Sequence, residues 1–404
     1  MAKLLLLIDD YLPHSTRVAA KMFHELSLEL VKLGNEVTVV TPNSVLESSF
    51  EEKFIDGIRV WYFQSGDVKT PSKIKRAITE TLLSYRAWSN LKFKFKSERF
   101  DGIVYYSPSI FWGGLVKRLK RLYQVPAYLV LRDIFPQWTI DAGMIREGSV
   151  IHRYFKYFEL LSYRQADMIG MMSEANINFF NQLHGNGFPL EVLRNWASLN
   201  EPTKPQSYLS QRERLGLQNK VIFFYGGNIG HAQDMANLMR LARALKDEPE
   251  AHFLFVGQGD EVELINQLAK EWQLDNVSYL PSIDQESFAA LLDEVDIGLF
   301  SLSNKHSSHN FPGKLLGYMQ HKLPILGSVN KGNDLISVVD ANKAGYISIN
   351  GNDEILYSNA ITLLSSLDER TKLGENGYKL LTKEFSVEAA AQQILVKLLM
   401  PSDK

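Results

Sequence analysis

A glycine-rich segment, YGGNIGHAQDM at residues 225–235, has the composition of a phosphate-binding loop. Glycines at positions 226, 227 and 230 allow a ligand to approach the backbone closely. The segment follows an apolar run and precedes a helical pattern near residue 233, where free backbone amides could bind a phosphate. The alternative is a tight turn between a strand and a helix that binds no ligand. The candidate ligand-binding residues are Gly227, Asn228, Gly230, His231, Gln233 and Asp234.

A second segment, SSHNFPGKLLGYMQHKLPILGS at residues 307–328, places a lysine where a helical pattern begins. Lys314 would lie in the first helical turn, where a cation is unfavourable unless an anion shares the site. We therefore expect Lys314 to bind a diphosphate, with an exposed surface lysine as the alternative. His309 could face the same ligand, although a single histidine is more often structural. Other residues expected beside this ligand are Asn310, Pro312, Gly313 and Leu315.

The segment LRDIFPQWTID, at residues 131–141, puts two charged side chains after an apolar run. Charges at the end of a buried strand are costly unless they are paired or functional. Asp133 could orient or deprotonate an acceptor hydroxyl, and Arg132 could bind the same acceptor. The two residues could equally form a structural ion pair.

The first loop of the chain, DDYLPHSTR at residues 9–17, occupies the matching position after the first apolar run. The aspartates at 9 and 10 lack a third partner at metal-binding spacing, and the chain has no HExxH or DxD pattern. We therefore expect neither a metal ion nor another cofactor. Thr16 also suits a helix cap, which is its structural alternative. The candidate acceptor-binding residues are Asp10, His14, Ser15, Thr16 and Arg17.

Short apolar runs alternate with amphipathic helical stretches, a pattern typical of parallel α/β sheets. One such helical stretch, Val18–Leu33, lies between the first two apolar runs. The strands expected in the first half are Leu4–Ile8, Glu36–Val40, Arg59–Phe63, Gly102–Tyr106, Ala127–Leu131, Met168–Met172 and Glu191–Arg194. Those expected in the second half are Lys220–Tyr225, His252–Val256, Val277–Leu280, Asp296–Phe300, Pro324–Leu326 and Gly345–Ile349.

A polar stretch with two prolines separates the two series and is typical of a linker. We predict one Rossmann-like, doubly wound domain at residues 1–196, a linker at 197–218 and a second such domain at 219–384. The last helix, about 385–400, could pack back on the first domain. The carboxyl ends of the two parallel sheets would meet at an interdomain cleft, and ligands bind at such edges in open α/β sheets.

The composition of the 404 residues fits a folded protein, with 45% hydrophobic and 22% charged side chains. The net charge of −2 provides no global attraction for nucleic acid, so no nucleic-acid partner is expected. There is no cysteine, which excludes disulfides and thiolate metal sites and fits a reducing compartment. The opening apolar run is too short for a signal peptide, and no run reaches the roughly 18 residues of a membrane-spanning helix. We therefore expect a cytoplasmic protein that could bind peripherally to the inner face of the plasma membrane.

A basic block lies inside this nearly neutral chain. Lys69 to Arg121 contains 13 basic and 3 acidic side chains, and aromatic residues are interleaved with them. This arrangement suits an anionic membrane surface with the apolar edge inserted. The alternative is a solvated helix face whose long side chains cover their own core.

The chain resembles the retaining glycosyltransferases of family 4, which have the GT-B architecture of two facing Rossmann-like domains. The likeness extends over essentially the whole length and is greatest for the bacterial O-antigen and capsule branch, including L-fucosaminyltransferases. The motifs that carry it, in chain order, are IDDYLPHSTR, GNEVTVVTP, LRDIFPQW, VLRNWASL, GGNIGHAQDM, FLFVGQGDE and FPGKLLGYMQHKLPILGS.

The resemblance implies a nucleoside-diphosphate sugar, expected to be a UDP-sugar, in the second domain and an acceptor in the first. Transfer would retain the anomeric configuration without a metal, because positive groups and amides stabilise the leaving diphosphate. By the same resemblance, Gly227–Asp234 and Lys314 would hold the diphosphate, and Asp133 would lie near the acceptor hydroxyl. The catalytic residues that we predict are Asp133, Lys314 and His309. Ser282 and Ile283 would flank the base.

Two departures from the family pattern affect this site. Many members carry two glutamates eight positions apart, where this chain has His309 and Gly317. The arginine and lysine that are usually found five apart in the phosphate loop align with Asn228 and Gln233. Because of the second departure, Lys314, His231 and backbone amides would have to neutralise the charge of the diphosphate. A deoxy or N-acetylated amino sugar such as L-FucNAc would suit a site that lacks the first glutamate.

The resulting hypothesis is a glycosyltransferase that adds one sugar to a polyprenyl-diphosphate-linked saccharide in O-antigen or capsule synthesis. One alternative is a nucleotide-sugar epimerase of the same fold, which should have more acidic and histidine groups around the sugar. Another is a non-catalytic subunit that binds lipid or a partner transferase.

Overall fold

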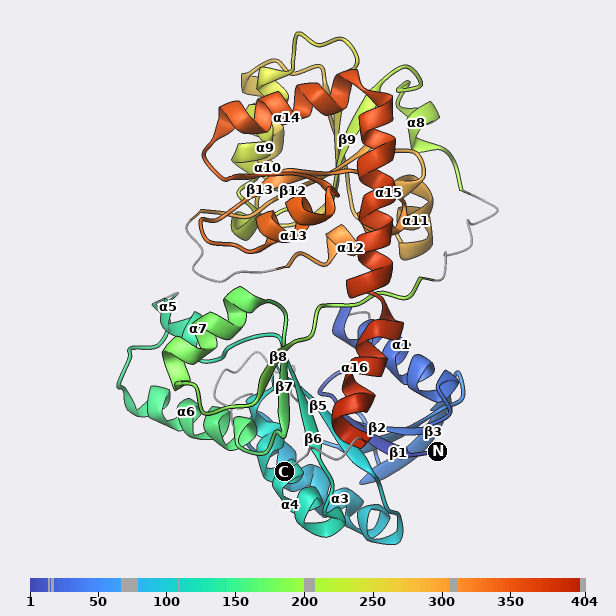
Figure 1. Cartoon of the computed structure of the whole chain (residues 1–404), viewed down its shortest axis with the longest axis vertical. Coiled ribbons are helices and arrows are strands. Elements are labelled where there is room, and N and C mark those ends of the chain that lie inside the picture. Colours follow the sequence, from blue (N-terminus) through green and yellow to red (C-terminus); the bar gives the residue numbers. More distant parts are fainter. Residues whose placement is uncertain are drawn as a thin grey trace. The chain divides into compact units, whose positions relative to one another are not determined.

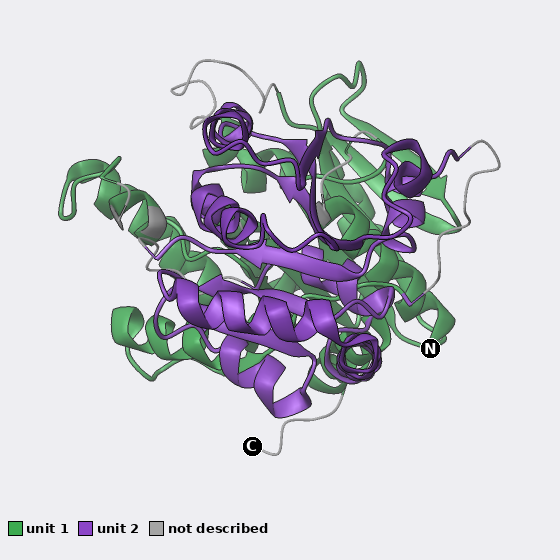
Figure 2. Ribbon diagram, turned by 90° about the horizontal axis from the view of Figure 1, so that it is seen from above, with its two compact units in different colours: residues 1–198, 387–404 green, residues 199–386 purple. Residues whose placement is uncertain are grey.

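The computed structural model describes residues 1–13, 15, 18–66, 79–107, 109–141, 143–199, 208–304 and 311–399. The chain forms two compact units (Figure 2). Unit 1 comprises Met1–Ser198 and Val387–Lys404, and unit 2 comprises Leu199–Ser386. The chain therefore leaves unit 1, builds unit 2 and returns to unit 1 with its last helix.

Unit 1 contains an eight-stranded sheet in the order β3-β4-β2-β1-β5-β6-β7-β8 (Figure 1). Every neighbouring pair is parallel except β3 and β4, which are antiparallel. The strands are β1 (Lys3–Leu7), β2 (Glu36–Asn43), β3 (Phe50–Ile55), β4 (Ile58–Gln64), β5 (Gly102–Ser107), β6 (Ala127–Leu131), β7 (Met168–Met171) and β8 (Leu190–Val192). The helices are α1 (Val18–Lys32), α3 (Leu83–Ser97), η1 (Ile110–Trp112), α4 (Gly113–Tyr123), α5 (Gln137–Asp141), α6 (Val150–Tyr163), α7 (Glu174–His184) and α16 (Val387–Leu399).

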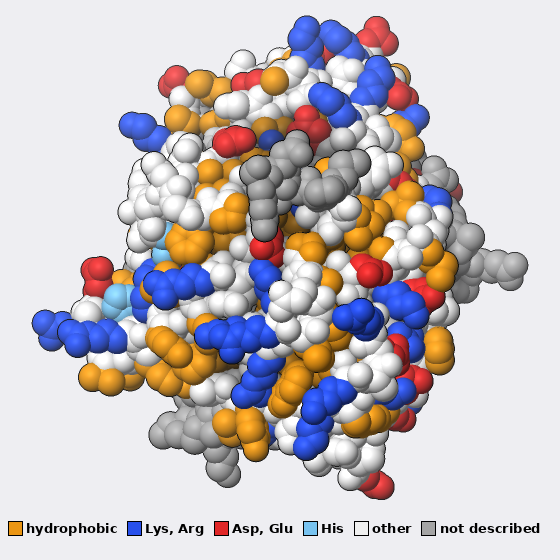
Figure 3. Space-filling view, turned by 60° about the horizontal axis from the view of Figure 1, so that its bottom comes forward, with side chains coloured by type: hydrophobic (Ala, Val, Ile, Leu, Met, Phe, Trp, Pro, Cys, Tyr) orange, Lys and Arg blue, Asp and Glu red, His pale blue; other side chains and the backbone are white. Residues whose placement is uncertain are grey.

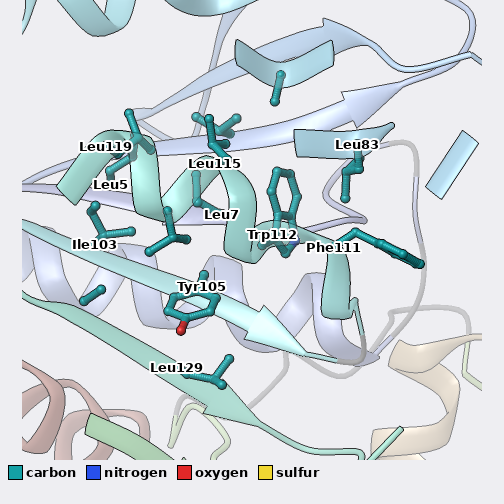
Figure 4. Close-up of a cluster of buried hydrophobic side chains, with 14 of the residues drawn as sticks. Leu5, Leu7, Leu83, Ile103, Tyr105, Phe111, Trp112, Leu115, Leu119 and Leu129 are labelled. Atoms are coloured by element: carbon teal, nitrogen blue, oxygen red, sulfur yellow. The ribbon is translucent and has the colours of Figure 1, made fainter. Parts of the chain in front are cut away.

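Helices cover both faces of this sheet because its central strands are apolar on both sides. Leu5 and Leu7 of β1 face a cluster formed with α3 and α4, where Trp112 and Leu115 are also buried (Figure 4). The alternate residues of β1, including Leu6, face a second cluster with α1 and α16. The return helix α16 packs against α1, and the side-chain amide of Gln393 donates to the carbonyl oxygen of Val192 at 2.7 Å.

Unit 2 contains a six-stranded parallel sheet in the order β11-β10-β9-β12-β13-β14. The strand order reverses at β9, and such a switch point creates a crevice at the carboxyl end of the strands. The strands are β9 (Val221–Asn228), β10 (Ala251–Gln258), β11 (Val277–Leu280), β12 (Ile297–Ser301), β13 (Ile325–Val329) and β14 (Gly345–Ile349). The helices are α8 (Gln211–Arg214), η2 (His231–Gln233), α9 (Met235–Ala244), α10 (Val262–Glu271), α11 (Gln285–Leu292), α12 (Lys314–Gln320), α13 (Leu335–Asn342), α14 (Asp353–Ser365) and α15 (Leu367–Glu384).

The expected α/β class with two parallel-sheet domains is confirmed. One strand, β3, was not expected from the sequence. It lies at the edge of the sheet and is only partly buried, so its sequence FEEKFI lacks the apolar run of a central strand. No helix in the described parts of the chain is long and apolar enough to cross a membrane.

Candidate functional site

The glycine-rich loop begins within the last residues of β9, at the switch point of unit 2. It passes very close to the neighbouring loop after β10. A side-chain carbon on Gly257 would lie 1.8 Å from the carbonyl oxygen of Gly227, and one on Gly259 would lie 2.1 Å from that of Ile229. Only glycine fits at these two positions, and their small size brings the two strand-end loops into contact.

The amides at the start of η2 and α9 are already bonded to carboxylates. The backbone N–H of His231 donates to Asp260 at 3.3 Å, and that of Met235 donates to Glu261 at 3.0 Å. Sequence reasoning expected these amides to be free for a phosphate, and this expectation was wrong. Asp260 and Glu261 follow the neighbouring parallel strand β10, which places their carboxylates at the same edge of the sheet.

The polar side chains of the loop are also bonded within unit 2. Asn228 donates to the side-chain oxygen of Gln233 at 2.9 Å. The imidazole Nδ1 of His231 lies 2.7 Å from a carboxylate oxygen of Glu261. Asp234 has a positive φ of 49° and accepts from the side-chain amide of Asn350 at 3.0 Å. These contacts hold the loop in place, and Gly227 at its start is exposed.

Lys314 differs from these residues because its side-chain amine has no hydrogen-bond partner among the residues that the structure describes. Its Nζ is inaccessible to solvent and lies 3.4 Å from the centroid of the Tyr225 ring, with no hydrogen bond to any described residue. The same atom is 3.9 Å from the position that a side-chain carbon on Gly227 would occupy. Burial lowers the pKa of the Lys314 amine well below its ordinary value. An anion at Gly227 would supply the missing partner and favour the charged form.

The residues around Lys314 belong to the turn before α12. Gly313 is exposed and Pro312 is partly buried, whereas Leu315 is 1% exposed and packs into the core. The backbone N–H of Leu315 donates to the carbonyl oxygen of Pro312 at 3.1 Å. The remaining residues predicted for this segment, His309 and Asn310, lie outside the described residues.

The two residues predicted beside the base lie after β11, the strand that neighbours β10. The hydroxyl of Ser282 is exposed and lies 3.4 Å from the side-chain oxygen of Gln258 at the end of β10. Ile283 is partly buried. Ser282 therefore lies near the end of β10, whose following loop contains Asp260. In the sheet, β10 and β11 lie on one side of β9, and β12 lies on the other.

In unit 1, Arg132 is a buried cation with several partners. Its guanidinium donates to the carbonyl oxygens of Arg194 at 3.1 Å and Leu131 at 3.4 Å. It also lies 5.4 Å from the centroid of the Trp196 ring. Burial lowers the pKa of Arg132 to about 10, so the group stays cationic at neutral pH. The Nε of Arg132 is buried and has no hydrogen bond to any described residue, so its predicted role in acceptor binding stays a prediction.

Asp133, by contrast, is exposed as a residue although protein groups partly desolvate its carboxylate. This desolvation raises the pKa of Asp133, and the nearby Arg132 opposes the shift. A carboxylate of raised pKa at a strand end is suited to accept a proton from a hydroxyl. The loop after β1 contributes Asp10, which accepts from the buried hydroxyl of Ser15 at 2.7 Å. The other predicted residues of that loop, His14, Thr16 and Arg17, lie outside the described residues.

Sequence reasoning missed four residues that shape the glycine-rich loop. The hydroxyl of Tyr225 donates to the carbonyl oxygen of Asn228 at 2.5 Å, and its ring lies against Lys314. The others are Asp260, Glu261 and Asn350. Asp260 and Glu261 could have been found, since both follow an apolar run that predicts a parallel neighbour of β9. No described group of three or more His, Asp and Glu side chains is arranged to hold a metal ion.

Comparison with known proteins identifies the domain that contains this loop. Residues 209–380 match the family of glycosyl transferases group 1, so this part of the chain is a glycosyltransferase group 1 domain. The chain is 23% identical over 244 residues to a Pseudomonas aeruginosa protein named as a glycosyltransferase, WbjE. That match covers 59% of this chain and 60% of the relative. This chain is also 24% identical over 329 residues to WcaI of Escherichia coli (strain K12), which is named as a colanic acid biosynthesis glycosyl transferase. That match covers 78% of this chain and 80% of WcaI.

Solved structures of similar fold are glycosyltransferases with the GT-B fold. Sucrose-phosphate synthase from Thermosynechococcus elongatus has a TM-score of 0.74 at 15% identity, with 98% of this chain and 97% of that chain covered. WaaG, a glycosyltransferase involved in lipopolysaccharide biosynthesis, has a TM-score of 0.65 at 13% identity, with 98% and 100% covered. HepE of Anabaena, solved with UDP and glucose, has a TM-score of 0.66 at 15% identity, with 98% of each chain covered. The chain therefore has the GT-B fold.

Proposed function

We propose that the chain is a retaining glycosyltransferase that moves a sugar from a UDP-sugar to a polyprenyl-diphosphate-linked saccharide. Unit 2 binds the donor and unit 1 binds the acceptor in this proposal. The fold and the group 1 domain support sugar transfer. The name of WcaI, a colanic acid biosynthesis glycosyl transferase, supports a role in the assembly of O-antigen, capsule or a related polysaccharide.

The observation that carries the proposal is the buried amine of Lys314, which has no hydrogen bond to any described residue. It lies beside Gly227 at the switch point of the sheet, where a ligand is expected to bind. A protein does not gain stability from an uncompensated buried amine, so a ligand is the simplest source of compensation. A diphosphate that leaves with negative charge fits this position, because the cation would stabilise that charge as it develops.

The amides at the start of α9 are not part of the proposed diphosphate site. Since Asp260 and Glu261 occupy them, the donor phosphates would lie on the Gly227 side of the loop, near Lys314. The carboxylates then repel a diphosphate from the α9 side and help to fix its position. His231 supports the loop through Glu261.

On the acceptor side, Asp133 is proposed to orient or deprotonate the hydroxyl that receives the sugar. Its raised pKa makes it a better base than an ordinary aspartate. The reaction requires the two units to bring Asp133 and Lys314 to the same sugar. The proposal includes no metal ion, because Lys314 supplies the charge that a metal would otherwise provide.

The lipid-linked acceptor would require the enzyme to meet an anionic membrane surface, as the basic block at 69–121 suggests. A deoxy or N-acetylated amino sugar such as L-FucNAc remains the proposed class of donor sugar. Both statements rest on the sequence hypotheses above. The protein would then act from the cytoplasmic face of the membrane.

The first test measures nucleotide binding, because it does not require the acceptor. Titration calorimetry with UDP, GDP and dTDP should show UDP binding to the wild type, weakened in Lys314→Met. The matched control is Lys372→Met on α15, an exposed lysine near Glu369 at 3.8 Å, which should bind UDP as the wild type does. Binding of no nucleotide, or equal binding by Lys314→Met, would contradict the proposed donor site.

The second test measures transfer. The protein is incubated with a panel of UDP- and dTDP-sugars and a polyprenyl-diphosphate-linked acceptor, with and without EDTA, and the product is analysed by NMR. Retention of the anomeric configuration and activity in EDTA are the expected results. Isomerisation of the donor sugar in the absence of acceptor would identify an epimerase instead.

A further inference from the structure

Helix α6 has apolar side chains on two faces, and among the described residues only its inner face contributes to a core cluster. Its inner face contributes Phe158 and Tyr163 to the first core cluster. Its outer face leaves Ile151 59% exposed and Tyr157 63% exposed. At the edge of the outer face, Tyr154 contacts the rings of Phe155 and Phe158, and its hydroxyl is hydrogen-bonded to that of Thr81. A helix that is apolar on both faces is normally buried on both, so the outer face of α6 is suited to a further partner.

The exposed residues of α6 form one continuous stripe. Positions 150, 154 and 157 follow helical spacing, and 151 lies beside them. We define the α6 apolar face as the exposed hydrophobic residues of this helix, which are Val150, Ile151, Tyr154 and Tyr157. Val150 alone is 83% exposed, and Met144 in the preceding loop is 71% exposed.

Basic residues surround this apolar face. Arg153 of α6 is exposed within the stripe, and Arg146 and Arg164 are exposed at its two ends. The neighbouring helix α4 packs against α6. We define the α4 basic face as the exposed cations of that helix, which are Lys117, Arg118 and Arg121. Figure 3 shows Lys and Arg side chains interspersed with hydrophobic ones over the end of the molecule that carries these helices.

Acidic side chains contribute little to this region. Glu159 of α6 is fully buried and bonded to Lys156 at 2.9 Å, and Asp167 is bonded to Lys120 of α4. Glu147 is the exposed acid in the described segment that connects α5 to α6. The exposed cations on α4 and α6 therefore outnumber the exposed acids Glu147 and Asp167.

The structure also changes the interpretation of the basic block at 69–121. Most of its aromatic residues lie in the core, since Phe95 and Trp112 are 0% exposed and Phe111 is 5% exposed. Only Tyr85 and Phe93 are exposed large hydrophobics among its described aromatics. The block therefore has few exposed aromatic residues, and the exposed apolar residues of α6 lie outside it.

We propose that the α6 apolar face and the α4 basic face together form a docking surface for an anionic lipid bilayer. Val150, Ile151 and the two tyrosines would insert at the level of the headgroups, where tyrosine is favoured, and the arginines would bind lipid phosphates. This inference rests on the proposed function only in that a lipid-linked acceptor requires such contact. The surface itself is argued from exposure and charge.

A second copy of the chain is a poorer occupant of the same surface. A two-fold interface pairs a patch with itself, so Arg153 and the α4 cations would face their own counterparts. Like charges so close together oppose association. An anionic bilayer offers both an apolar layer and the opposite charge.

The test is flotation of the full chain with vesicles of phosphatidylcholine, with or without phosphatidylglycerol. The wild type should float only with the phosphatidylglycerol vesicles, and the bound fraction should fall as salt is raised. Ile151→Ser combined with Tyr157→Ser should lower the partition coefficient by roughly tenfold. Arg118→Gln combined with Arg121→Gln should lower it by about fivefold for each charge removed.

The matched control replaces an isoleucine and a tyrosine on a helix of unit 2. Ile355 and Tyr357 of α14 are 48% and 37% exposed, so Ile355→Ser combined with Tyr357→Ser removes the same side chains from another surface. This variant should float as the wild type does. All variants should retain their melting temperature and UDP affinity, which separates loss of docking from misfolding.

Several outcomes would overturn the docking surface. These are equal flotation with both vesicle types, flotation of the α6 variant at the wild-type level, and a dimer in sedimentation velocity that the α6 variant abolishes while flotation persists. Preferential binding of nucleic acid over vesicles would also overturn it. Flotation without UDP binding would support the docking surface and contradict the proposed function. UDP binding without flotation would contradict the docking surface and support the proposed donor site.

Discussion

Arg132 in unit 1 and Lys314 in unit 2 are both buried cations near the carboxyl end of a central strand, but their surroundings differ. Arg132 donates to two carbonyl oxygens and lies over the ring of Trp196. Lys314 lies over the ring of Tyr225 and has no hydrogen bond to any described residue. Burial lowers the pKa of Arg132 only to about 10, whereas it lowers that of Lys314 well below its usual range.

We propose that this difference separates a mainly structural cation from a ligand-binding one. The two terminal nitrogens of Arg132 have protein partners, and such contacts contribute to folding, although its Nε has no hydrogen bond to any described residue. An ammonium held without partners in a preformed position contributes to binding instead, because the ligand completes its hydrogen bonds. We therefore assign structure to Arg132 and donor binding to Lys314, and the following predictions test this assignment.

The largest effect is expected for Lys314→Met. Loss of one charge-assisted contact to a diphosphate should weaken UDP binding by roughly a hundredfold, or about 2.7 kcal/mol. The free energy of unfolding should stay the same or rise, because the substitution removes a buried, uncompensated amine. Calorimetry and denaturant unfolding measure the two quantities on the same sample. A fall in stability together with unchanged UDP affinity would reverse the assignment.

Arg132→Leu should show the opposite pattern. The carbonyl oxygens of Arg194 and Leu131 would lose their donor, and the stacking on Trp196 would be lost. We expect a destabilisation of about 2 kcal/mol. UDP affinity should not change, because Arg132 belongs to the other unit. Weaker UDP binding by a stably folded Arg132→Leu protein would contradict the comparison.

Much of the fold could be predicted because the central strands are buried on both faces. The register of β9 with β10 shows where such prediction stops. The expected strands ended at Tyr225 and Val256, yet the ladder continues through Gly227 paired with Gly257 and Asn228 paired with Gln258. Glycine and amide residues suggest a loop in sequence, but here they extend the strands because the two backbones approach closely.

The candidate site was less accessible to sequence reasoning. Composition located the glycine-rich loop and Lys314, since both follow the strand-to-helix pattern. It could not show that Glu261 bonds to the amide of Met235, because that contact joins loops about 26 residues apart in the chain. It also could not show that Tyr225 lies under Lys314, since a tyrosine in a buried strand has the sequence signature of a core residue.

The pH dependence of UDP binding provides a smaller test of the same site. Lys314 has a depressed pKa in the free protein, and a bound diphosphate should raise it. Between these two pKa values, binding takes up a proton, so the affinity should fall by up to about tenfold for each unit of rising pH. Calorimetry in buffers of different ionisation enthalpy measures this uptake. Lys314→Arg should bind UDP without it, because arginine stays charged over this range.

The smallest effect is expected for Tyr225→Phe. This substitution keeps the ring that lies under Lys314 and removes the hydrogen bond from the tyrosine hydroxyl to the carbonyl oxygen of Asn228. The bond shapes the turn at Gly227, so its loss should reduce UDP affinity by about threefold to fivefold, or less than about 1 kcal/mol. Lys314 itself should keep its depressed pKa and its proton uptake.

Comparison with Tyr225→Leu makes this last prediction sharper. Leucine removes the ring as well as the hydroxyl, so Lys314 would lose the surface that holds its ammonium in place. If preorganisation of the cation matters most, Tyr225→Leu should bind UDP several times more weakly than Tyr225→Phe. If the two variants bind equally, the loop geometry at Asn228 dominates, and the Lys314 ammonium would be a weaker determinant of donor binding than the comparison with Arg132 implies.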